Sequence, residues 1–480
     1  MDLKQAWQDI YATAPAQLSK LQQVRGVASV FNANIDAVLK VSPDMLLKWM
    51  QELKADEWQV LNTGGKRIAE PTDVLRGFVE CFSKGIAQEW LVTDEAAFSW
   101  MRDNMGYDRL QMGGQGGIIA NVMAVAGAQR VYVHCASLPG QQAGLFLGLP
   151  TLLSTDQAGR LHPASQVDRG GDRPLIHWIL EFDKGAELTI GGLTLTCPKS
   201  NRFIATYDPL NFVLAVDQGF DAALRDPAQP LDVILLSGYQ MLTEPLAGGA
   251  PGSGLQRIHD SWQKVQAWKD AHPGVVVHFE FASTQDQRIR RELADFLAVR
   301  ADSVGCNEQE LIGMLEVLGE SAAVRECQAL DSVGLFKGLL IVYERLKLKR
   351  IQLHMFGLYV TLIRPGAASE GPAFDPAANV RGMAFAATLA AAKAGTGSLE
   401  DPRNLLWAHG HAVSEHSLKE LRALDAHLRA AHAAAGLSET GLASAPGFEV
   451  AAVPTILIEK PVTLVGMGDT ISSLSLVGAR

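Results

Sequence analysis

The sequence lacks the features of a membrane-spanning or nucleic-acid-binding chain. No apolar stretch reaches the about 18 residues needed to cross a bilayer. The first 21 residues mix charged and apolar side chains, without the apolar core of a signal peptide. Lys and Arg number 42 against 52 Asp and Glu, so the net charge of −10 gives no basic field for nucleic acid. We therefore expect a cytoplasmic protein with neither a nucleic-acid nor a membrane partner.

Cysteine is also scarce. The chain has 5 cysteines, widely spaced and without a CxxC pair, which argues against a disulfide scaffold and favours a reducing compartment. His409, His411 and His416 lack matching Cys or acidic ligands, so no zinc site is expected there. The glycine-rich segment 112–117 is no dinucleotide fingerprint, because Ile119 stands where GxGxxG needs its last glycine.

What the sequence does contain is typical of an α/β protein with a second, smaller unit. A length of 480 residues exceeds one compact core, and 48% apolar residues are ordinary for a globular chain. Mostly helical stretches separate buried strands predicted at 26–32, 131–134, 233–238, 275–281, 351–357 and 462–468. Residues 42–105 are predicted to be mainly helical, and 159–195 to form an antiparallel sheet. This alternation predicts a largely parallel sheet covered on both faces.

The segment VTLVGMGDTISS (462–473) carries the strongest chemical signal. It is predicted to run from a strand through a glycine turn into the start of a helix. Backbone N–H groups of Gly466, Met467 and Gly468, together with the helix N-terminus, can stabilise a developing anion. Asp469 can then act as general base towards a hydroxyl group. The alternative is that Asp469 only caps the helix.

Two acidic motifs suggest a magnesium site. Glu280 follows His278 at a predicted strand end, and Glu310 shares a helix face with Asn307 in the motif NEQE. Carboxylates at strand ends can hold Mg²⁺ beside phosphate oxygens. The alternative is a solvated strand-end acid and an ordinary first helical turn.

The segment FNANIDA (31–37) places amide and carboxylate groups directly after the first strand. Open α/β sheets bind ligands at the carboxyl ends of their strands, and a polyol needs such donors and acceptors. The alternative is an Asn/Asp turn.

Together and in this order, the motifs resemble those of the ADP-dependent glucokinases. These belong to the ADP-dependent glucokinase/phosphofructokinase family of the ribokinase-like superfamily. The resemblance runs nearly end to end and is carried by FNANIDA, GIAQEW (85–90), MGGQGGIIAN (112–121), IHWILEF (176–182), PKSNRFIA (198–205), HFEFAS (278–283), SVGCNEQEL (303–311), LHMFGLY (353–359) and VGMGDTISS (465–473).

The resemblance implies a ribokinase-like, Rossmann-type three-layer α/β sandwich with a smaller α+β lid. The large nucleotide-binding domain would comprise residues 1–36, 116–158 and 205–480, and the sugar-binding lid 37–115 and 159–204. The implied reaction moves the β-phosphoryl group of ADP to glucose, giving glucose 6-phosphate and AMP with Mg²⁺ as cofactor. We expect a monomer.

The resemblance also assigns roles to residues. Asp469 is similar to the catalytic base, Gly466 to Gly468 form the anion hole, and Glu280, Glu310 and Asp469 face the metal. The implied sugar contacts are Asn34, Asp36, Glu89, Gly114, Gln115 and His177. The implied nucleotide contacts are Arg202, Asn307, His354 and Tyr359, with Arg202 on the phosphates.

The resemblance leaves the acceptor open. Glu89 marks glucose use, because a carboxylate hydrogen-bonds a neutral sugar but repels a phosphate. Lys184 and Lys199 lie near the expected lid and could instead serve fructose 6-phosphate. The alternatives are a phosphofructokinase or bifunctional enzyme, an ATP-dependent ribokinase-like kinase, and a silent sugar-binding homologue. Two departures from the family pattern concern affinity: Leu358 replaces a frequent aromatic, and Lys199 a usual arginine.

Overall fold

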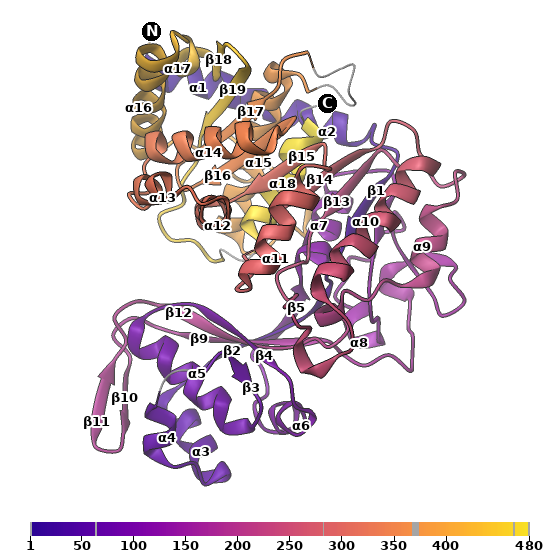
Figure 1. Ribbon diagram of the computed structural model, residues 1–480, viewed down its shortest axis with the longest axis vertical. Helices are drawn as coiled ribbons and strands as arrows, with labels where there is room; N and C mark the ends of the chain where they lie inside the picture. Colours follow the sequence, from indigo (N-terminus) through magenta and orange to yellow (C-terminus); the bar gives the residue numbers. More distant parts are fainter. Residues whose placement is uncertain (1, 63–64, 282, 367–373, 464–465, 479–480) are drawn as a thin grey trace.

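Two sheets divide the molecule into a larger and a smaller unit (Figure 1). The computed structural model describes residues 2–62, 65–281, 283–366, 374–463 and 466–478. In these residues the larger sheet has 11 strands and the smaller sheet has 6. The two units have separate apolar cores.

The larger sheet is parallel in its centre and antiparallel at both edges. The buried strands are short runs rich in Val, Ile and Leu, as expected for a sheet covered on both faces. In spatial order they are β18 (Leu442–Ala445), β19 (Phe448–Pro454), β17 (Leu358–Ile363), β16 (Arg350–Met355), β15 (Ser303–Cys306), β14 (Val276–Glu280), β13 (Val233–Leu236), β1 (Val27–Val30), β6 (Val131–Val133), β7 (Leu152–Thr155) and β8 (Leu161–Pro163).

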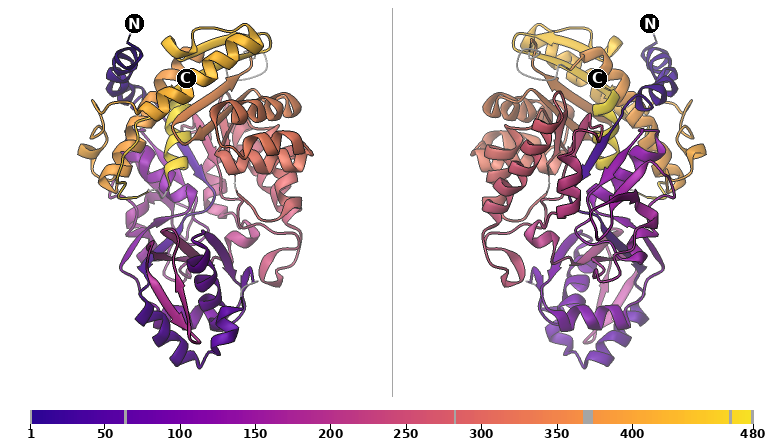
Figure 2. Two further views of the ribbon diagram at one scale, coloured as in Figure 1. Left: turned by 90° about the vertical axis from the view of Figure 1, so that its left-hand side faces the viewer. Right: turned by 90° about the vertical axis from the view of Figure 1, so that its right-hand side faces the viewer.

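Helices cover the two faces of this sheet, which lies between them in Figure 2. One layer contains α7 (Gln115–Val125), α15 (Pro376–Thr396) and α18 (Met467–Gly478), and α18 contacts both of the others. The opposite layer contains α10 (Gly254–Ala271), α11 (Gln287–Glu292), α12 (Glu308–Leu318), α14 (Ser332–Leu346) and α16 (Glu415–His432). The N-terminal α1 (Leu3–Ala12) packs on α15 and α17 (Leu437–Thr440).

The smaller unit packs helices on one six-stranded sheet. Its strand order is β3 (Arg67–Ile68), β4 (Gln88–Val92), β12 (Asn201–Tyr207), β9 (Ile176–Phe182), β2 (Asn34–Lys40) and β5 (Arg109–Gly113). Its helices are α3 (Pro43–Leu53), α4 (Glu57–Leu61), α5 (Pro71–Lys84) and α6 (Glu95–Asn104). The hairpin of β10 (Glu187–Ile190) and β11 (Leu193–Thr196) lies at the far end of this unit (Figure 1).

The predicted α/β class with a second, smaller α+β unit is confirmed. None of the described helices is long and apolar enough to cross a membrane. The five cysteines are buried and unpaired.

The strand predicted at 462–468 is wrong for the described residues. Val462 is 68% exposed, Gly466 lies in a turn, and Met467 already begins α18. Leu464 and Val465 lie outside the described residues.

Two further expectations need correction. The mainly helical region 42–105 also contains β4, whose Trp90 side chain is buried against Phe203 of β12. The sheet expected at 159–195 is mixed, because β9 pairs parallel with β2 and antiparallel with β12. β8 lies inside the range 159–204 that is predicted for the lid, but it pairs with β7 of the larger sheet. The exact domain boundaries stay predictions.

Candidate active site

The N-terminus of α18 lies between two cavities. Gly466 and Asp469 line a cavity of about 230 Å³ between the two sheets. Met467 and Gly468 line a larger cavity of about 960 Å³ on the other side. The first turn of α18, with its free N–H groups, therefore separates the two ligand-sized spaces.

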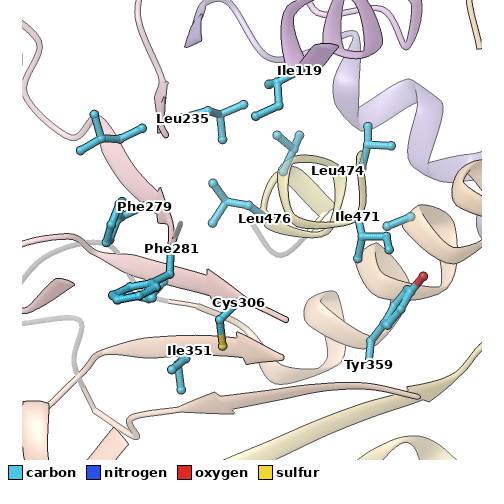
Figure 3. Close-up of a cluster of buried hydrophobic side chains, with 14 of the residues drawn as sticks. Ile119, Leu235, Phe279, Phe281, Cys306, Ile351, Tyr359, Ile471, Leu474 and Leu476 are labelled. Carbon is cyan, nitrogen blue, oxygen red and sulfur yellow. The ribbon is translucent and has the colours of Figure 1, made fainter. Parts of the chain in front are cut away.

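Packing against the apolar core fixes the position of α18. Its apolar side chains Ile471, Leu474 and Leu476 are buried, and Figure 3 shows them beside Ile119 of α7 and residues of the central strands. The helix N-terminus is thus held at the sheet edge where β14 and β15 end. This is the edge at which α/β sheets bind ligands.

The smaller cavity collects five of the six predicted sugar contacts. Its walls come from the smaller sheet and from the start of α18 and α7, and the predicted residues on them are Asp36, Glu89, Gly114, Gln115 and His177. Asn34 is absent from the wall. It is buried behind it and donates its Nδ2 to Asp36 Oδ1 at 3.0 Å.

Gly114 connects β5 to α7 at the cavity wall, and its backbone requires glycine. Its φ of 73° lies in the left-handed region, and a Cβ atom there would approach the Asn32 carbonyl oxygen to 2.5 Å. This close approach brings Gln115, the first residue of α7, directly into the cavity.

Asp469 is the third residue of α18, so it is not the residue that precedes the helix. Its Oδ1 accepts a hydrogen bond from Gln115 Nε2 at 3.1 Å. Gln115 is itself held by Gly238 N, which donates to its Oε1 at 3.0 Å. Burial raises the pKa of Asp469, while the Lys393 ammonium group and Gln115 act in the opposite direction. The carboxylate is oriented and open to the cavity, as a general base requires.

Lys393 of α15 is a site residue that the sequence analysis missed. Its Nζ donates to the Gly466 carbonyl oxygen at 3.3 Å, and its positive charge acts on Asp469. Burial lowers the pKa of Lys393 to about 8. No local motif marks it, because it lies within an alanine-rich helix whose composition predicts a buried core helix.

The sugar-facing side chains are held by a network of their own. Thr206 Oγ1 donates to Glu89 Oε1 at 2.6 Å, and His177 Nε2 lies 3.1 Å from Asp208 Oδ2. Burial raises the pKa of Asp36. Burial opposes a charge on His177, but its hydrogen bond to Asp208 and the nearby acids outweigh this and raise the pKa of His177. The wall therefore offers both acceptors and a donor to hydroxyl groups.

Three more residues at this cavity were not predicted. Asp208 orients His177, while Asn32 and Gln240 line the wall with a buried amide atom each, Asn32 Nδ2 and Gln240 Oε1, that has no partner. Asn32 is part of FNANIDA and could have been found there, whereas Gln240 has no sequence signal. Unpaired buried polar atoms in a cavity wall are suited to a polar ligand.

The two predicted metal acids meet at the ends of β14 and α12. In the described part of the chain, Glu280, Glu310 and His354 are the one group of potential metal ligands whose donor atoms all lie within 4.8 Å of one another. Asp469 is not in this group, although its negative charge raises the pKa of Glu280 and of Glu310. Within the part of the chain that the structure describes, His409, His411 and His416 belong to no such cluster.

The position of Glu310 follows from helix capping. Asn307 precedes α12, and its Oδ1 accepts from Glu310 N at 3.0 Å. In return, Glu310 Oε2 accepts from Asn307 N at 2.9 Å. The alternative that Glu310 belongs to an ordinary first helical turn is therefore correct for the local structure. The same capping contact places the Glu310 carboxylate beside Glu280.

These residues fit a divalent cation. Burial raises the pKa of Glu280 to about 7, and burial together with the charge of Glu280 raises the pKa of Glu310 well above its usual value. Two buried carboxylates facing each other need a positive charge, and carboxylate oxygens are the ligands that Mg²⁺ prefers. His354 is the less suitable member of the cluster, because Mg²⁺ prefers oxygen.

The larger cavity has the size and lining of a site for a planar apolar group. His354 and Tyr359 line it, as predicted for nucleotide contacts, together with Phe356 and alanines of α15. Asn307 does not line it; its neighbour Glu308 does. Arg202, predicted on the nucleotide phosphates, lies on the wall of the smaller cavity instead.

Comparison with known proteins fits this geometry. Residues 25–478 match the family model described as ADP-specific phosphofructokinase/glucokinase conserved region. An ADP-dependent glucose/glucosamine kinase from Pyrococcus furiosus is 28% identical, over 98% of both chains. An ADP-specific phosphofructokinase from Methanosarcina acetivorans is 26% identical, over 99% of this chain and 97% of that protein.

Solved structures agree. The last common ancestor of ADP-dependent phosphofructokinases from Methanosarcinales superposes with a TM-score of 0.84 at 27% identity, covering 100% of this chain and 99% of that one. An ADP-dependent kinase in complex with fructose-6-phosphate and ADPβS superposes with a TM-score of 0.82 at 26% identity, covering 98% and 97%.

Fold and site thus define an ADP-dependent sugar kinase of ribokinase-like fold. Within that class, the chain belongs to the ADP-specific phosphofructokinase/glucokinase family.

Proposed function

We propose that this protein transfers the β-phosphoryl group of ADP to glucose, with glucose 6-phosphate and AMP as products. The observation that supports glucose is the pair of carboxylates, Asp36 and Glu89, on the wall of the smaller cavity. Carboxylates accept hydrogen bonds from neutral hydroxyl groups and repel a sugar phosphate. Lys184 and Lys199, the cations considered for a sugar phosphate, are exposed and do not line this cavity.

The positions of the two cavities suggest how the substrates meet. ADP occupies the larger cavity with its phosphates at the α18 N-terminus, and the sugar occupies the smaller one. The amides of Gly466, Met467 and Gly468 then face the transferring group from between the two ligands. Asp469 takes the proton from the attacking sugar hydroxyl, while Gln115 holds the carboxylate in place.

Two other elements complete the mechanism. Arg202 projects its guanidinium from β12 into the smaller cavity, where lid closure brings it to the phosphates and excludes water. Glu280 and Glu310 are the residues that would hold magnesium, which supplies positive charge to the phosphate oxygens of the donor. His354, Tyr359 and the α12 cap at Asn307 lie on the donor side.

Fructose 6-phosphate is the second candidate acceptor. Arg202 is the only lysine or arginine among the described residues lining the smaller cavity, and a guanidinium binds phosphate well. The Methanosarcina acetivorans relative is named as a phosphofructokinase.

The test is magnesium-dependent AMP release from ADP, with glucose and fructose 6-phosphate as separate acceptors and ATP as a parallel donor. We expect AMP release from ADP when glucose is the acceptor. AMP only with fructose 6-phosphate would reassign the enzyme as a phosphofructokinase, and AMP with both would make it bifunctional. Turnover with none of the pairs would favour a silent binder.

Glu89→Ala tests the basis of acceptor choice. We expect kcat/KM for glucose to fall at least tenfold, about 1.4 kcal/mol, because a hydrogen-bonding carboxylate is lost. The effect on fructose 6-phosphate should be smaller. Thr206→Val is the matched control, because it removes only the hydroxyl that holds Glu89. An unchanged ratio between the two acceptors in Glu89→Ala would remove Glu89 as the selector.

A further inference from the structure

A chain of buried hydrogen bonds reaches Glu280 from behind the active site. Arg350 Nη1 on β16 donates to Ser303 Oγ on β15 at 2.6 Å. Ser303 Oγ lies 2.9 Å from His278 Nδ1, and His278 Nε2 lies 3.2 Å from Glu280 Oε2. All four residues are at most 3% exposed. The chain is therefore shielded from bulk solvent.

The donors and acceptors available give each hydrogen bond in this chain a single direction. A guanidinium can only donate, so Ser303 Oγ accepts from Arg350. The carboxylate of Glu280 is ionised when it holds a cation and can then only accept, so in that state the proton of the neutral His278 ring belongs on Nε2. His278 Nδ1 is then an acceptor, and the Ser303 hydroxyl hydrogen points to it. The serine thereby selects the tautomer that donates to Glu280.

We propose that Ser303 and Arg350 are positioning residues for Glu280, and that they act through His278. They fix the tautomer and the ring orientation of His278, and so hold the carboxylate of Glu280 where a divalent cation binds. Without the serine hydroxyl, the ring can carry its proton on Nδ1 and turn a lone pair towards the carboxylate. Glu280 would then lose the donor on Oε2, while its hydrogen bond with Ser472 remains, and the carboxylate would be held less firmly. This inference rests on the proposed metal site of Glu280 and Glu310.

Arg350 has a second branch that makes Ser303 the better residue to test. Its Nη2 donates to Gln352 Oε1 at 2.6 Å, and Gln352 Nε2 donates to Ser475 Oγ of α18 at 3.1 Å. Its Nε donates to Asn379 Oδ1 at 2.8 Å. Substituting Arg350 would therefore disturb α15 and α18 as well as Glu280. Substituting Ser303 removes the partner of Arg350 Nη1 and the link to His278 and Glu280, but it leaves the bonds from Arg350 to Gln352 and Asn379 in place.

The experiment compares the wild type with Ser303→Ala and Ser303→Thr. Alanine removes the hydroxyl, while threonine keeps it and serves as the conservative variant. The dissociation constant of Mn²⁺ alone is measured from the free-ion electron paramagnetic resonance signal, and Tm is recorded in parallel. We expect Mn²⁺ binding to weaken at least tenfold in Ser303→Ala, the usual cost of losing a group that orients a metal ligand. Ser303→Thr should stay within threefold of the wild type.

The outcomes separate this inference from the proposed metal site. If the wild type binds Mn²⁺ and Ser303→Ala binds it equally well, the positioning role is wrong and the metal site stands. If the wild type does not bind Mn²⁺, the metal site itself fails, and the positioning role with it. If a Ser303 variant does not fold, His278→Gln and His278→Leu replace the pair. Glutamine keeps an N–H for Glu280 and should retain tighter Mn²⁺ binding than leucine, and equal binding would overturn the inference.

Discussion

At the scale of the residue, the site depends on charges that burial brings close together. Asp469 lies on the cavity wall beside Gly466, with Gln115 fixing one oxygen and Lys393 supplying positive charge. Its pKa is raised by burial, which favours proton uptake from a hydroxyl group. Glu280 and Glu310 form a second acidic pair, and the charge of Asp469 contributes to the raised pKa of both.

Asp469→Asn should lower kcat by about 10²–10⁴-fold, the usual contribution of a general base. The amide keeps the size of the side chain and can still pair with Gln115, so AMP binding and Tm should stay close to wild type. Single-turnover AMP release and AMP titration measure the two effects. Turnover near that of the wild type would exclude Asp469 as the base.

Glu280 gives the metal-free protein a pH-dependent stability of defined sign. Burial raises its pKa from 4.5 to about 7, so the folded chain holds this proton more tightly than the unfolded chain does. The stabilisation of the folded state by protonated Glu280 is full below about pH 4.5 and is lost as the pH rises through about 7.

Urea unfolding of the metal-free protein between pH 5 and 8 checks this. We expect the free energy of unfolding of the wild type to fall with pH relative to Glu280→Gln, by up to about 1.4 kcal/mol per unit. Added Mg²⁺ should restore it at high pH in the wild type only. Parallel curves for the two proteins would contradict the raised pKa.

At the scale of the element, α18 positions the chemistry because it packs tightly on α15. Gly382 of α15 faces the last turns of α18, where a Cβ atom would come within 2.7 Å of the Ser475 carbonyl oxygen and 2.9 Å of the Gly478 backbone. The two helices can approach this closely because both facing positions, Gly382 and Gly478, are glycine. α15 also carries Lys393, so the distance between the helices sets the distance from Lys393 to Asp469.

Gly382→Ala should therefore lower both stability and kcat. Overpacking between the helices should cost about 1–3 kcal/mol of unfolding free energy, and the displaced Lys393 and Asp469 should reduce turnover. Gly170→Ala is the control, since nothing lies within 4 Å of a Cβ atom at that position. Urea unfolding and AMP-release assays measure the two effects, and equal values for both variants would show that the close contact does not matter.

At the scale of the whole molecule, the chain crosses between the two units next to the smaller cavity. The link from β1 to β2 and the single residue Gly114 between β5 and α7 are both short and lie at the cavity wall. Cavity residues come from both units, so a ligand there contacts both. This arrangement is typical of a kinase in which closure around the substrates excludes water.

Glucose and AMP together should reduce the radius of gyration measured by small-angle X-ray scattering, whereas AMP alone should have a smaller effect. The physical reason is that only the sugar bridges the wall residues of the two units. Asp36→Ala, which removes a wall residue of the smaller unit, should weaken the compaction at a given glucose concentration. A radius that does not change with glucose would exclude closure driven by the sugar.

The class of fold and most of the chemical groups of the site follow from local sequence patterns. Buried apolar runs of this length and composition favour the strands of a covered sheet, and FNANIDA, NEQE and GMGD predict a turn, a helix cap and a helix start. These signals are short-range, so they survive without knowledge of the fold. The strand expected at 462–468 is wrong for the described residues for the same reason. An apolar run predicts burial or an extended backbone, but it does not predict whether the segment pairs with a sheet.

Which of these groups meet is visible only in the folded chain. Gln115 and Asp469 are 354 positions apart, and Lys393 lies in an alanine-rich helix with no motif of its own. The links from Arg350 through Ser303 to His278 join three neighbouring strands, and their register exists only once the sheet has formed. Contacts between distant segments depend on the packing of the whole chain, and local sequence patterns do not encode them.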